Sequence, residues 1–439
     1  MGTFLYEAVL PNPKLDTPTP KKIVLATFGS LGDLYPYLSI ARELKRRGHH
    51  PIVASAERHR KAVETANLEF APMRPEWPAP DQMERAFAPV MDARGGTKYL
   101  FEKLILPQLR ESYDDLLSLC RDADLLISHS LVPAAPLVAQ TMGIAWISCV
   151  LSPIFLASRR DPPRLPIAPQ IGDWPLVGKA WSRALLSLVQ KRLLPTTQLI
   201  AALRVDLGLA PGAHPIFAGQ HSPQRVLALF SPHFAAPQSD WPCQTRLTGF
   251  CFYNGEGELP DEVQSFLEDG APPVVFTLGA SSIHAARDFF EQSFEAIRST
   301  PLRALFIVGD NSASLPNAPS KVSLVSYAPL SQLLPRTAAL VQHGGAGTGA
   351  LAWRAATPML IVPQANDQPD NAVRFARTGA ARVLWRHQYR ANRVAQELQL
   401  LRGAAHYSHR AEVMRARIEK EDGAKAACDE VEEVLNGAR

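Results

Sequence analysis

The chain has 439 residues and a formal net charge of +4, because 46 Lys and Arg residues outnumber 42 Asp and Glu residues. This length exceeds one ordinary hydrophobic core and predicts two domains. The basic residues are scattered rather than clustered, which excludes the charge pattern of a nucleic-acid-binding protein. The five cysteines are odd in number and form no C-x-x-C pair, so we expect neither a disulfide framework nor a zinc site.

Residues 1–20 are rich in proline and lack the basic start and long apolar core of a signal peptide. We expect a Pro-rich leader there. No apolar run of the sequence is long enough to span a bilayer, so we predict no transmembrane segment. The cysteine content favours a cytoplasmic protein, and peripheral attachment to the inner membrane is the alternative.

Residues 21–250 predict a first α/β domain. The apolar run at 21–28 predicts a buried strand, and the helical pattern at 34–47 is followed by a second strand-like run at 51–56. A strand, a helix and a strand in this order form a βαβ unit, which implies a parallel sheet. Further strand-like runs follow at 124–128, 144–150 and 225–230.

The stretch 152–181 interrupts this alternation and is rich in proline, aromatic and aliphatic residues. A long irregular insertion in an α/β domain is usually functional or a linker. We predict that it lines an apolar pocket through Phe155, Trp174 and Trp181. A surface connection with no ligand role explains the pattern equally well.

Residues 251–270 combine Gly, Pro and acidic residues and predict a linker. Residues 271–415 then predict a second doubly wound domain. Its six strand-like runs lie at 273–279, 303–309, 321–327, 338–342, 358–363 and 381–385. The last residues, 416–439, predict a helical segment that packs back on the first domain.

Polar, glycine-containing clusters follow several of these runs, where doubly wound sheets bind ligands. The sequence HGGAGTGALAW, from His343, predicts a strand–loop–helix turn whose glycines allow a ligand to approach closely. Free N–H groups of the new helix favour a phosphate, and Thr348 and His343 add donors. The loop lacks the Lys of a Walker motif, which disfavours ATP hydrolysis. A tight turn with Thr348 as N-cap is the alternative.

The cluster NDQPDN follows the next predicted strand. The carboxylate of Asp367 and the amide of Gln368 suit the vicinal hydroxyls of a sugar. A helix start capped by Asp367 or Asp370 is the alternative. No His or acid is placed to complete a metal site, so no metal is expected.

The cluster GSLGD follows the first predicted strand and lacks the G-x-G-x-x-G pattern of a dinucleotide loop. Asp33 would repel a pyrophosphate, which argues against NAD. Taken alone, Asp33 is more often a helix cap, and a general base opening toward the cleft is the alternative.

Together these motifs resemble glycosyltransferase family 1, whose members use nucleotide-activated sugars. The resemblance extends from Lys21 to about Arg402 and rests on QHGGAGT and ATPMLIVPQANDQPDNA. It is closest to the bacterial branch that holds the rhamnosyltransferase chain of rhamnolipid synthesis and sterol and flavonoid glycosyltransferases. It implies the GT-B fold: two doubly wound, Rossmann-like parallel-sheet domains facing a cleft, with the acceptor on the first domain and the donor on the second.

The resemblance also implies residue roles. Asp33 matches the catalytic base. Apart from the resemblance, His129 ends a predicted strand and is a second catalytic candidate, with a structural histidine as the alternative. Tyr327 stands where plant members stack a Trp on the base. The expected donor-binding residues are Gly279, Ser281, Ser282, Tyr327, His343, Gly345, Gly347, Thr348, Asp367 and Gln368.

The implied activity is an inverting, metal-independent hexosyltransferase without a cofactor. Its expected partners are a nucleoside diphosphate sugar, with dTDP-rhamnose favoured over UDP-glucose, and a small apolar hydroxyl acceptor such as a flavonoid or other phenolic. The alternatives are a lipid or sterol glycosyltransferase acting on a hydroxy fatty acid, a nucleotide-sugar epimerase, and a non-catalytic binding subunit of the same fold.

Overall fold

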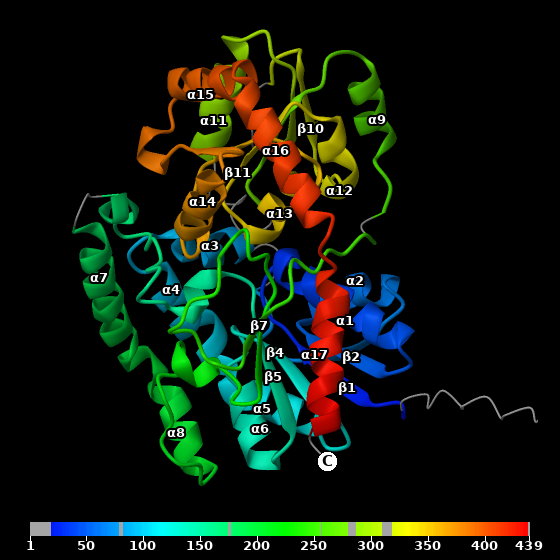
Figure 1. Ribbon diagram of the computed structural model, residues 1–439, viewed down its shortest axis with the longest axis vertical. Coiled ribbons are helices and arrows are strands. Elements are labelled where there is room, and N and C mark those ends of the chain that lie inside the picture. The colour runs from blue at the N-terminus through cyan, green and yellow to red at the C-terminus, as the bar shows by residue number, and fades with distance from the viewer. Residues whose placement is uncertain are drawn as a thin grey trace, which may run out of the picture.

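The computed structural model describes residues 19–78, 82–173, 177–255, 257–279, 287–309 and 318–437. It contains two parallel sheets, one of seven strands and one of six, each flanked by helices (Figure 1). The predicted pair of doubly wound α/β domains is therefore confirmed. The expected leader at 1–20 lies outside the described residues except for its last two.

The first sheet has the order β3-β2-β1-β4-β5-β6-β7. Its strands are β1 (Lys22–Ala26), β2 (His50–Ser55), β3 (Glu69–Pro72), β4 (Leu125–His129), β5 (Ala145–Val150), β6 (Arg225–Ala228) and β7 (Thr245–Leu247). The sequence did not reveal β3 and β7, because these partly exposed edge strands lack a continuous apolar run. The ends of β1 and β4 bring two loops together at the middle of this sheet.

The helices of the first domain surround this sheet. They are α1 (Leu31–Arg46), α2 (Arg60–Thr65), α3 (Met83–Phe87), α4 (Gly96–Tyr99), α5 (Leu109–Leu119), α6 (Ala135–Met142), α7 (Gly178–Leu193) and α8 (Gln198–Asp206). Leu34, Tyr37 and Leu44 of α1 are fully buried, as their helical spacing predicts. This burial fixes the helix against β1 and so fixes the loop that precedes it.

The second sheet has the order β10-β9-β8-β11-β12-β13. Its strands are β8 (Val274–Thr277), β9 (Ala304–Ile307), β10 (Val322–Val325), β11 (Ala339–Gln342), β12 (Met359–Ile361) and β13 (Ala381–Val383). Each lies within one of the six runs expected from the sequence. The helices around it are α9 (Asp261–Glu268), α11 (Arg287–Arg298), α12 (Leu330–Leu333), α13 (Ala346–Arg354), α14 (Gln368–Arg377) and α15 (Ala391–Gly403).

An aromatic cluster joins the two domains. The ring centroid of Phe375 lies 4.6 Å from that of Phe234 and 4.7 Å from that of Trp353. Gly349 of α13 is required here, because a Cβ at that position would lie 2.2 Å from the Phe375 ring. The cluster sets how closely the domains approach and therefore the width of the space between them.

The chain then returns to the first domain. After α16 (Ala405–Ile418), helix α17 (Gly423–Gly437) lies beside α1 (Figure 1). Buried Cys428 and Val431 join the core under α1, and Arg47 pairs with Glu432 at 2.9 Å. No helix within the described residues has the length and apolar character needed to cross a membrane.

Candidate active site

A cavity of about 930 Å³ lies between the two domains. The first domain contributes a mainly apolar wall, and the second contributes glycine and polar side chains from the ends of its strands. The apolar wall is formed by Phe28, Trp77, Phe87, Val90, Met91, Leu100, Phe101, Leu131, Ile154, Phe155, Leu165, Ile167, Leu186, Val189, Leu193, Ile216 and Phe217. The cavity therefore offers one polar and one apolar surface to the molecules it holds.

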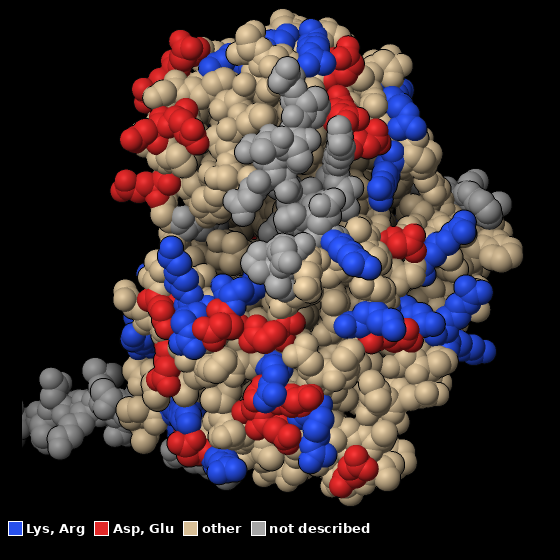
Figure 2. Space-filling model, turned by 180° about the vertical axis from the view of Figure 1, so that it is seen from behind, with Lys and Arg blue, Asp and Glu red and all other residues tan. Residues whose placement is uncertain are grey.

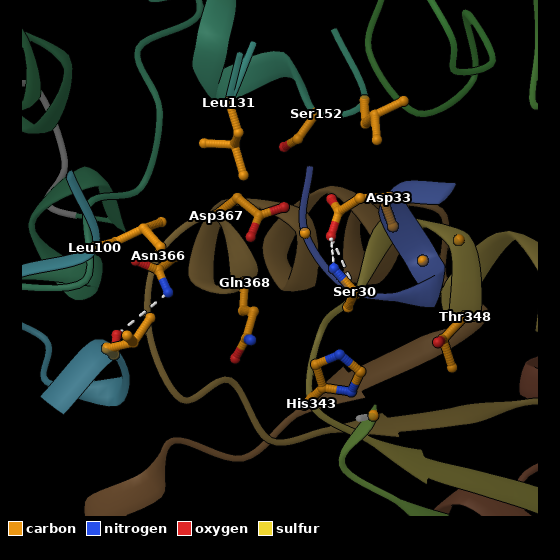
Figure 3. Close-up of a pocket in the computed structure, with 18 of the residues that line it drawn as sticks. Ser30, Asp33, Leu100, Leu131, Ser152, His343, Thr348, Asn366, Asp367 and Gln368 are labelled. Atoms are coloured by element: carbon orange, nitrogen blue, oxygen red, sulfur yellow. Dashed lines mark hydrogen bonds between the residues drawn. The ribbon is translucent and has the colours of Figure 1, made fainter. Parts of the chain in front are cut away.

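Asp33 lies in the first turn of α1 and lines this cavity. Its Oδ2 accepts hydrogen bonds from the Ser30 backbone N (2.7 Å) and from Ser30 Oγ (2.9 Å). Ser30 is the N-cap residue, and Asp33 is the third helical residue of the same capping box. The N-cap residue is therefore Ser30 rather than Asp33. The other carboxylate oxygen of Asp33, Oδ1, points toward the cavity (Figure 3).

His129 ends β4 behind this carboxylate. Its Nδ1 lies 3.0 Å from the Phe28 carbonyl, which can only accept, so Nδ1 carries the proton. Burial lowers the pKa of His129 below its usual value, against the opposing charge of Asp33. The neutral ring therefore turns the lone pair of Nε2 toward Asp33 Oδ1, 4.0 Å away.

Gly29 makes room for the carboxylate. It has a φ of +135°, and a Cβ there would lie 2.3 Å from Asp33 Oδ2. A residue with a side chain would face both backbone strain and a collision at this point. A glycine at position 29 thus allows the Asp33 carboxylate to approach Ser30 and accept its hydrogen bonds.

On the opposite wall, the loop after β11 leads into α13. Gly344 has a φ of +100°, and its N–H donates to the buried Gln342 side chain at 2.6 Å. Gly345 is the N-cap residue, so Thr348 is the third helical residue rather than the cap. The free N–H groups of the first turn face the cavity that Gly345, Gly347 and Thr348 line.

His343 lies beside this turn (Figure 3). A Cβ on Gly279 would be 2.7 Å from the ring, and one on Gly345 would also be 2.7 Å from it, so glycines on both sides admit it. Burial lowers the pKa of His343 to about 4, which keeps the ring neutral at pH 7. Its buried Nδ1 has no hydrogen-bond partner among the described residues. The His343 ring also lines the cavity, so it borders the space that a ligand would occupy.

Asp367 and Gln368 lie at the start of α14 and line the same cavity. Gln368 Oε1 accepts from the backbone N–H groups of Gln364 (2.9 Å) and Ala365 (3.2 Å), which directs its amide NH₂ elsewhere. Burial raises the pKa of Asp367 to about 6; the Asn371 hydrogen bond opposes the rise, and the charge of Asp33 adds to it. The carboxyl groups of Asp33 and Asp367 thus face the same cavity, where the charge of Asp33 disfavours ionisation of Asp367 (Figure 3).

Asn371 holds Asp367 and the glycine loop in place through its side-chain hydrogen bonds. Its Nδ2 donates to Asp367 Oδ2 (2.7 Å) and to the Gly344 carbonyl (2.9 Å). Its Oδ1 accepts from Ser152 Oγ of the first domain at 2.8 Å. One buried amide therefore connects the glycine loop, the Asp367 carboxylate and the facing domain.

Buried charges of α14 make a second connection between the domains. Arg374 pairs with Asp370 at 2.8 Å and with Asp161 of the first domain at 2.6 Å. Asp370 also accepts from the Arg164 backbone N–H at 3.0 Å. Burial works against the charge of Asp161, but Arg374 and Arg377 outweigh it and lower the pKa of that carboxyl. The helix that presents Asp367 is thus bonded to the segment that lines the apolar wall.

Of the remaining predicted site residues, some line the cavity and others do not. Tyr327 and Phe155 line the cavity, as does Gly279. Trp181 was expected to contact an apolar ligand, but it points away from the cavity on α7 and is 55% exposed. Ser281, Ser282 and Trp174 lie outside the described residues.

Part of the apolar wall was not foreseen from the sequence. It comes from residues 77–101, where Trp77 stacks on Phe87 with centroids 4.5 Å apart. Asn366, with a φ of +55°, also joins the domains by accepting from Thr97 Oγ1 at 3.2 Å. The sequence signal was a Trp, two Phe and two Met within a stretch of 25 residues, counted from 77 to 101. In the described part of the chain, no three His, Cys, Asp or Glu residues form a group suited to a metal ion.

Two family models match the chain. The glycosyltransferase family 28 N-terminal domain matches residues 23–110, and the erythromycin biosynthesis protein CIII-like C-terminal domain matches residues 305–435. Both matches include residues of the cavity, Asp33 in the first and His343, Asp367 and Gln368 in the second. Each model thus covers part of one wall of the cavity.

Named relatives agree with these models. O-mycaminosyltylonolide 6-deoxyallosyltransferase of Streptomyces fradiae is 31% identical over 382 residues, which is 82% of this chain and 84% of that protein. A sterol 3-beta-glucosyltransferase of Leptosphaeria maculans is 25% identical over 96% of this chain, which spans 29% of that longer protein. The solved structure of the spinosyn rhamnosyltransferase SpnG, complexed with thymidine diphosphate, matches with a TM-score of 0.65 and 17% identity, covering 94% of this chain and all of that one. The chain therefore belongs to the glycosyltransferases of family 1 with the GT-B fold, and it is a sugar transferase.

Proposed function

We propose that the protein is an inverting, metal-independent hexosyltransferase that moves rhamnose from dTDP-rhamnose to a hydroxyl group of a small hydrophobic acceptor. One observation carries the proposal: a single cavity has the open Asp33 carboxylate on one wall and the α13 N-terminus, His343, Asp367 and Gln368 on the other. A base and a donor-binding surface that face each other are what a direct displacement requires.

In this mechanism Asp33 Oδ1 takes the proton of the acceptor hydroxyl, because Oδ2 is already occupied by Ser30. The acceptor oxygen bonds to the anomeric carbon from the face opposite the diphosphate. The bond between that carbon and the diphosphate oxygen breaks, and the nucleoside diphosphate leaves with the electron pair. A single displacement of this kind inverts the anomeric configuration.

The leaving group gains negative charge at the oxygen that departs. The N–H groups at the start of α13 and the neutral His343 ring are suited to stabilise that charge without a metal ion. Asp367 and the NH₂ of Gln368 are suited to bind the sugar hydroxyls. Tyr327 borders the same cavity and is the candidate to stack on the base.

His129 has a second role in this proposal. Its Nε2 is an acceptor that faces Asp33 Oδ1. While Asp33 is ionised both atoms are acceptors, and at 4.0 Å they form no direct hydrogen bond. Once Oδ1 is protonated it becomes a donor, and a small rotation of the carboxyl or one bridging water would let it donate to Nε2. His129 would then stabilise the protonated Asp33 that forms when the acceptor loses its proton.

The choice of donor rests on relatives. SpnG is a rhamnosyltransferase that binds thymidine diphosphate, and the Streptomyces fradiae relative transfers a 6-deoxyallosyl group. Rhamnose and 6-deoxyallose are both 6-deoxyhexoses, which supports dTDP-rhamnose as first choice and leaves UDP-glucose second. The donor is a co-substrate, and no separate cofactor is required.

The choice of acceptor rests on the apolar wall. Phe28, Trp77, Phe101 and Phe155 offer aromatic contacts that suit a flavonoid or another phenolic. A phenol also suits a carboxylate base, which is weak because its reference pKa is about 4. A lipid or sterol acceptor is the second candidate, favoured by the same wall and by the sterol glucosyltransferase relative.

Release of nucleoside diphosphate tests the proposal. Each donor, dTDP-rhamnose and UDP-glucose, is incubated with the protein, with and without quercetin, in the presence of EDTA. We expect quercetin-dependent release from dTDP-rhamnose. Release that does not depend on any acceptor would favour an epimerase or hydrolase, and binding without release from either donor, also with a sterol acceptor, would favour a non-catalytic subunit.

A further inference from the structure

Exposed large hydrophobic side chains gather on one part of the molecule. Nine such residues occur among the described residues, and seven of them lie between residues 167 and 205. They are Ile167, Val177, Trp181, Leu188, Leu194, Leu199 and Val205. Single exposed hydrophobic residues are ordinary, but a concentration on two consecutive helices marks an interaction surface. We name the exposed surface of residues 177–205 the α7–α8 face.

The spacing of these residues gives α7 two apolar sides. Val177, Trp181 and Leu188 are separated by four and seven residues, so they lie on one side of the helix. Leu186 and Leu193 point the other way and line the active-site cavity. The inward side is buried against the first domain. On the outward side, Trp181 is 55% and Leu188 46% exposed, so neither is covered by the residues that the structure describes.

The α7–α8 face is also basic. Residues 178–206, which span α7 and α8, include five basic residues, Lys179, Arg183, Lys191, Arg192 and Arg204, and one acidic residue, Asp206. On α7, Lys191 and Arg192 lie nearest the side of Trp181 and Leu188, whereas Lys179 and Arg183 are about 160° around the helix from Trp181. In Figure 2, Lys and Arg side chains follow the right-hand edge of the molecule, where α7 lies in that view. The whole chain is nearly balanced at +4, so this separation of charge is local rather than general.

We propose that the α7–α8 face docks on the surface of an anionic lipid bilayer. Helices that present Trp and Leu together with Lys and Arg bind in the interfacial region of membranes, where apolar side chains enter and basic ones meet lipid phosphates. A two-fold contact with a second copy of this chain would instead bring two basic faces together, which like-charge repulsion disfavours.

The α7–α8 face lies next to the active-site cavity. Ile167 and Arg192 are exposed at its border and also line the cavity, so the face is continuous with the apolar wall of the active site. A hydrophobic acceptor partitions into lipid rather than water. A protein docked by this face would meet its acceptor where the acceptor is most concentrated.

Vesicle flotation tests the docking directly, and it does not depend on transferase activity. The full chain is mixed with vesicles of phosphatidylcholine alone, or of phosphatidylcholine with phosphatidylglycerol. We expect flotation with the anionic vesicles only, and we expect added salt to reduce it, because screening weakens attraction between exposed charges and the surface.

Variants assign the binding to the face. Trp181→Ser with Leu188→Ser should abolish flotation. Lys191→Gln should lower the vesicle affinity about 5-fold, which corresponds to about 1 kcal/mol for one basic residue near an anionic surface. Leu400→Ser is the matched control, because Leu400 is 50% exposed on α15, away from the face, and it should leave flotation unchanged. Thermal unfolding and dTDP binding establish that each variant is folded.

Three results would overturn the proposal. One is equal flotation of the wild type and the Trp181→Ser, Leu188→Ser variant. Another is the absence of wild-type flotation with anionic vesicles. The third is a wild-type dimer in light scattering that the same two substitutions dissociate, since the face would then be the contact between two copies of the chain.

Discussion

Replacing Asp367 with Asn should make the protein more stable at neutral pH while impairing transfer. Burial raises the pKa of Asp367 to about 6, from the ordinary value of 3.8. The difference of about 2 pKa units corresponds to about 3 kcal/mol, at about 1.4 kcal/mol per unit. Because the folded-state pKa lies above the unfolded one, the wild type keeps its full stability below about pH 4 and loses this amount as the pH rises through 6.

Asn removes the charge and keeps the shape. Its side-chain oxygen can still accept the hydrogen bond that Asn371 donates to Asp367 at 2.7 Å. The two proteins should therefore be about equally stable near pH 4, and the variant should be more stable by up to about 3 kcal/mol at pH 7.5. Transfer should fall, because the neutral amide of Asn binds a sugar hydroxyl less strongly than the charged carboxylate of Asp367 does.

Urea unfolding at a series of pH values measures this difference. Asp114→Asn is the control, because its carboxylate on α5 is 53% exposed and its removal should change stability by less than about 1 kcal/mol at every pH. A stability difference between wild type and Asp367→Asn that does not vary with pH would refute the reasoning. So would a variant that is less stable than the wild type at pH 7.5.

Three further substitutions test other parts of the site. His343→Ala should weaken dTDP binding about 10- to 100-fold in calorimetry, the loss of one hydrogen bond to a charged group; an unchanged dissociation constant would remove His343 from the diphosphate site. Arg374→Ala should lower the free energy of unfolding by about 3–5 kcal/mol, because it leaves the carboxylate partners of that buried residue unpaired, and a loss below about 1 kcal/mol would contradict this. Gly29→Ala should abolish transfer by displacing Asp33, whereas Gly143→Ala, at a φ of +66° with open space around it, should strain the backbone and keep the transfer rate.

The fold followed from the sequence where the strands are buried on both faces. The strands β8, β9 and β11 are buried at every position and are mainly apolar, with Thr277 and Gln342 as the polar exceptions, so their apolar pattern was nearly continuous. The edge strands β3 and β7 were missed because their exposed and polar residues interrupt the apolar run. The edge strands β10 and β13 are also partly exposed, but they lie in longer apolar runs and were found.

The site was predictable where polar clusters directly follow predicted strands. Asp33, His343 and Asp367 follow strands whose carboxyl ends meet, and the structure brings all three to one cavity. The wall at residues 77–101 and the bonds of Asn371 were not predictable, because they depend on how the two domains pack. Trp181 was misplaced for a related reason: helical spacing shows that a side chain is opposite Leu186, but it does not show which side faces the cavity.

The central claim is that Asp33 is the base of a sugar transfer in this cavity. The direct measurement compares wild type and Asp33→Asn for the rate of acceptor glycosylation and for the donor dissociation constant. The account predicts a rate lower by about 10²- to 10⁴-fold, as for loss of a general base, with donor binding unchanged. A variant that transfers sugar at the wild-type rate would contradict it.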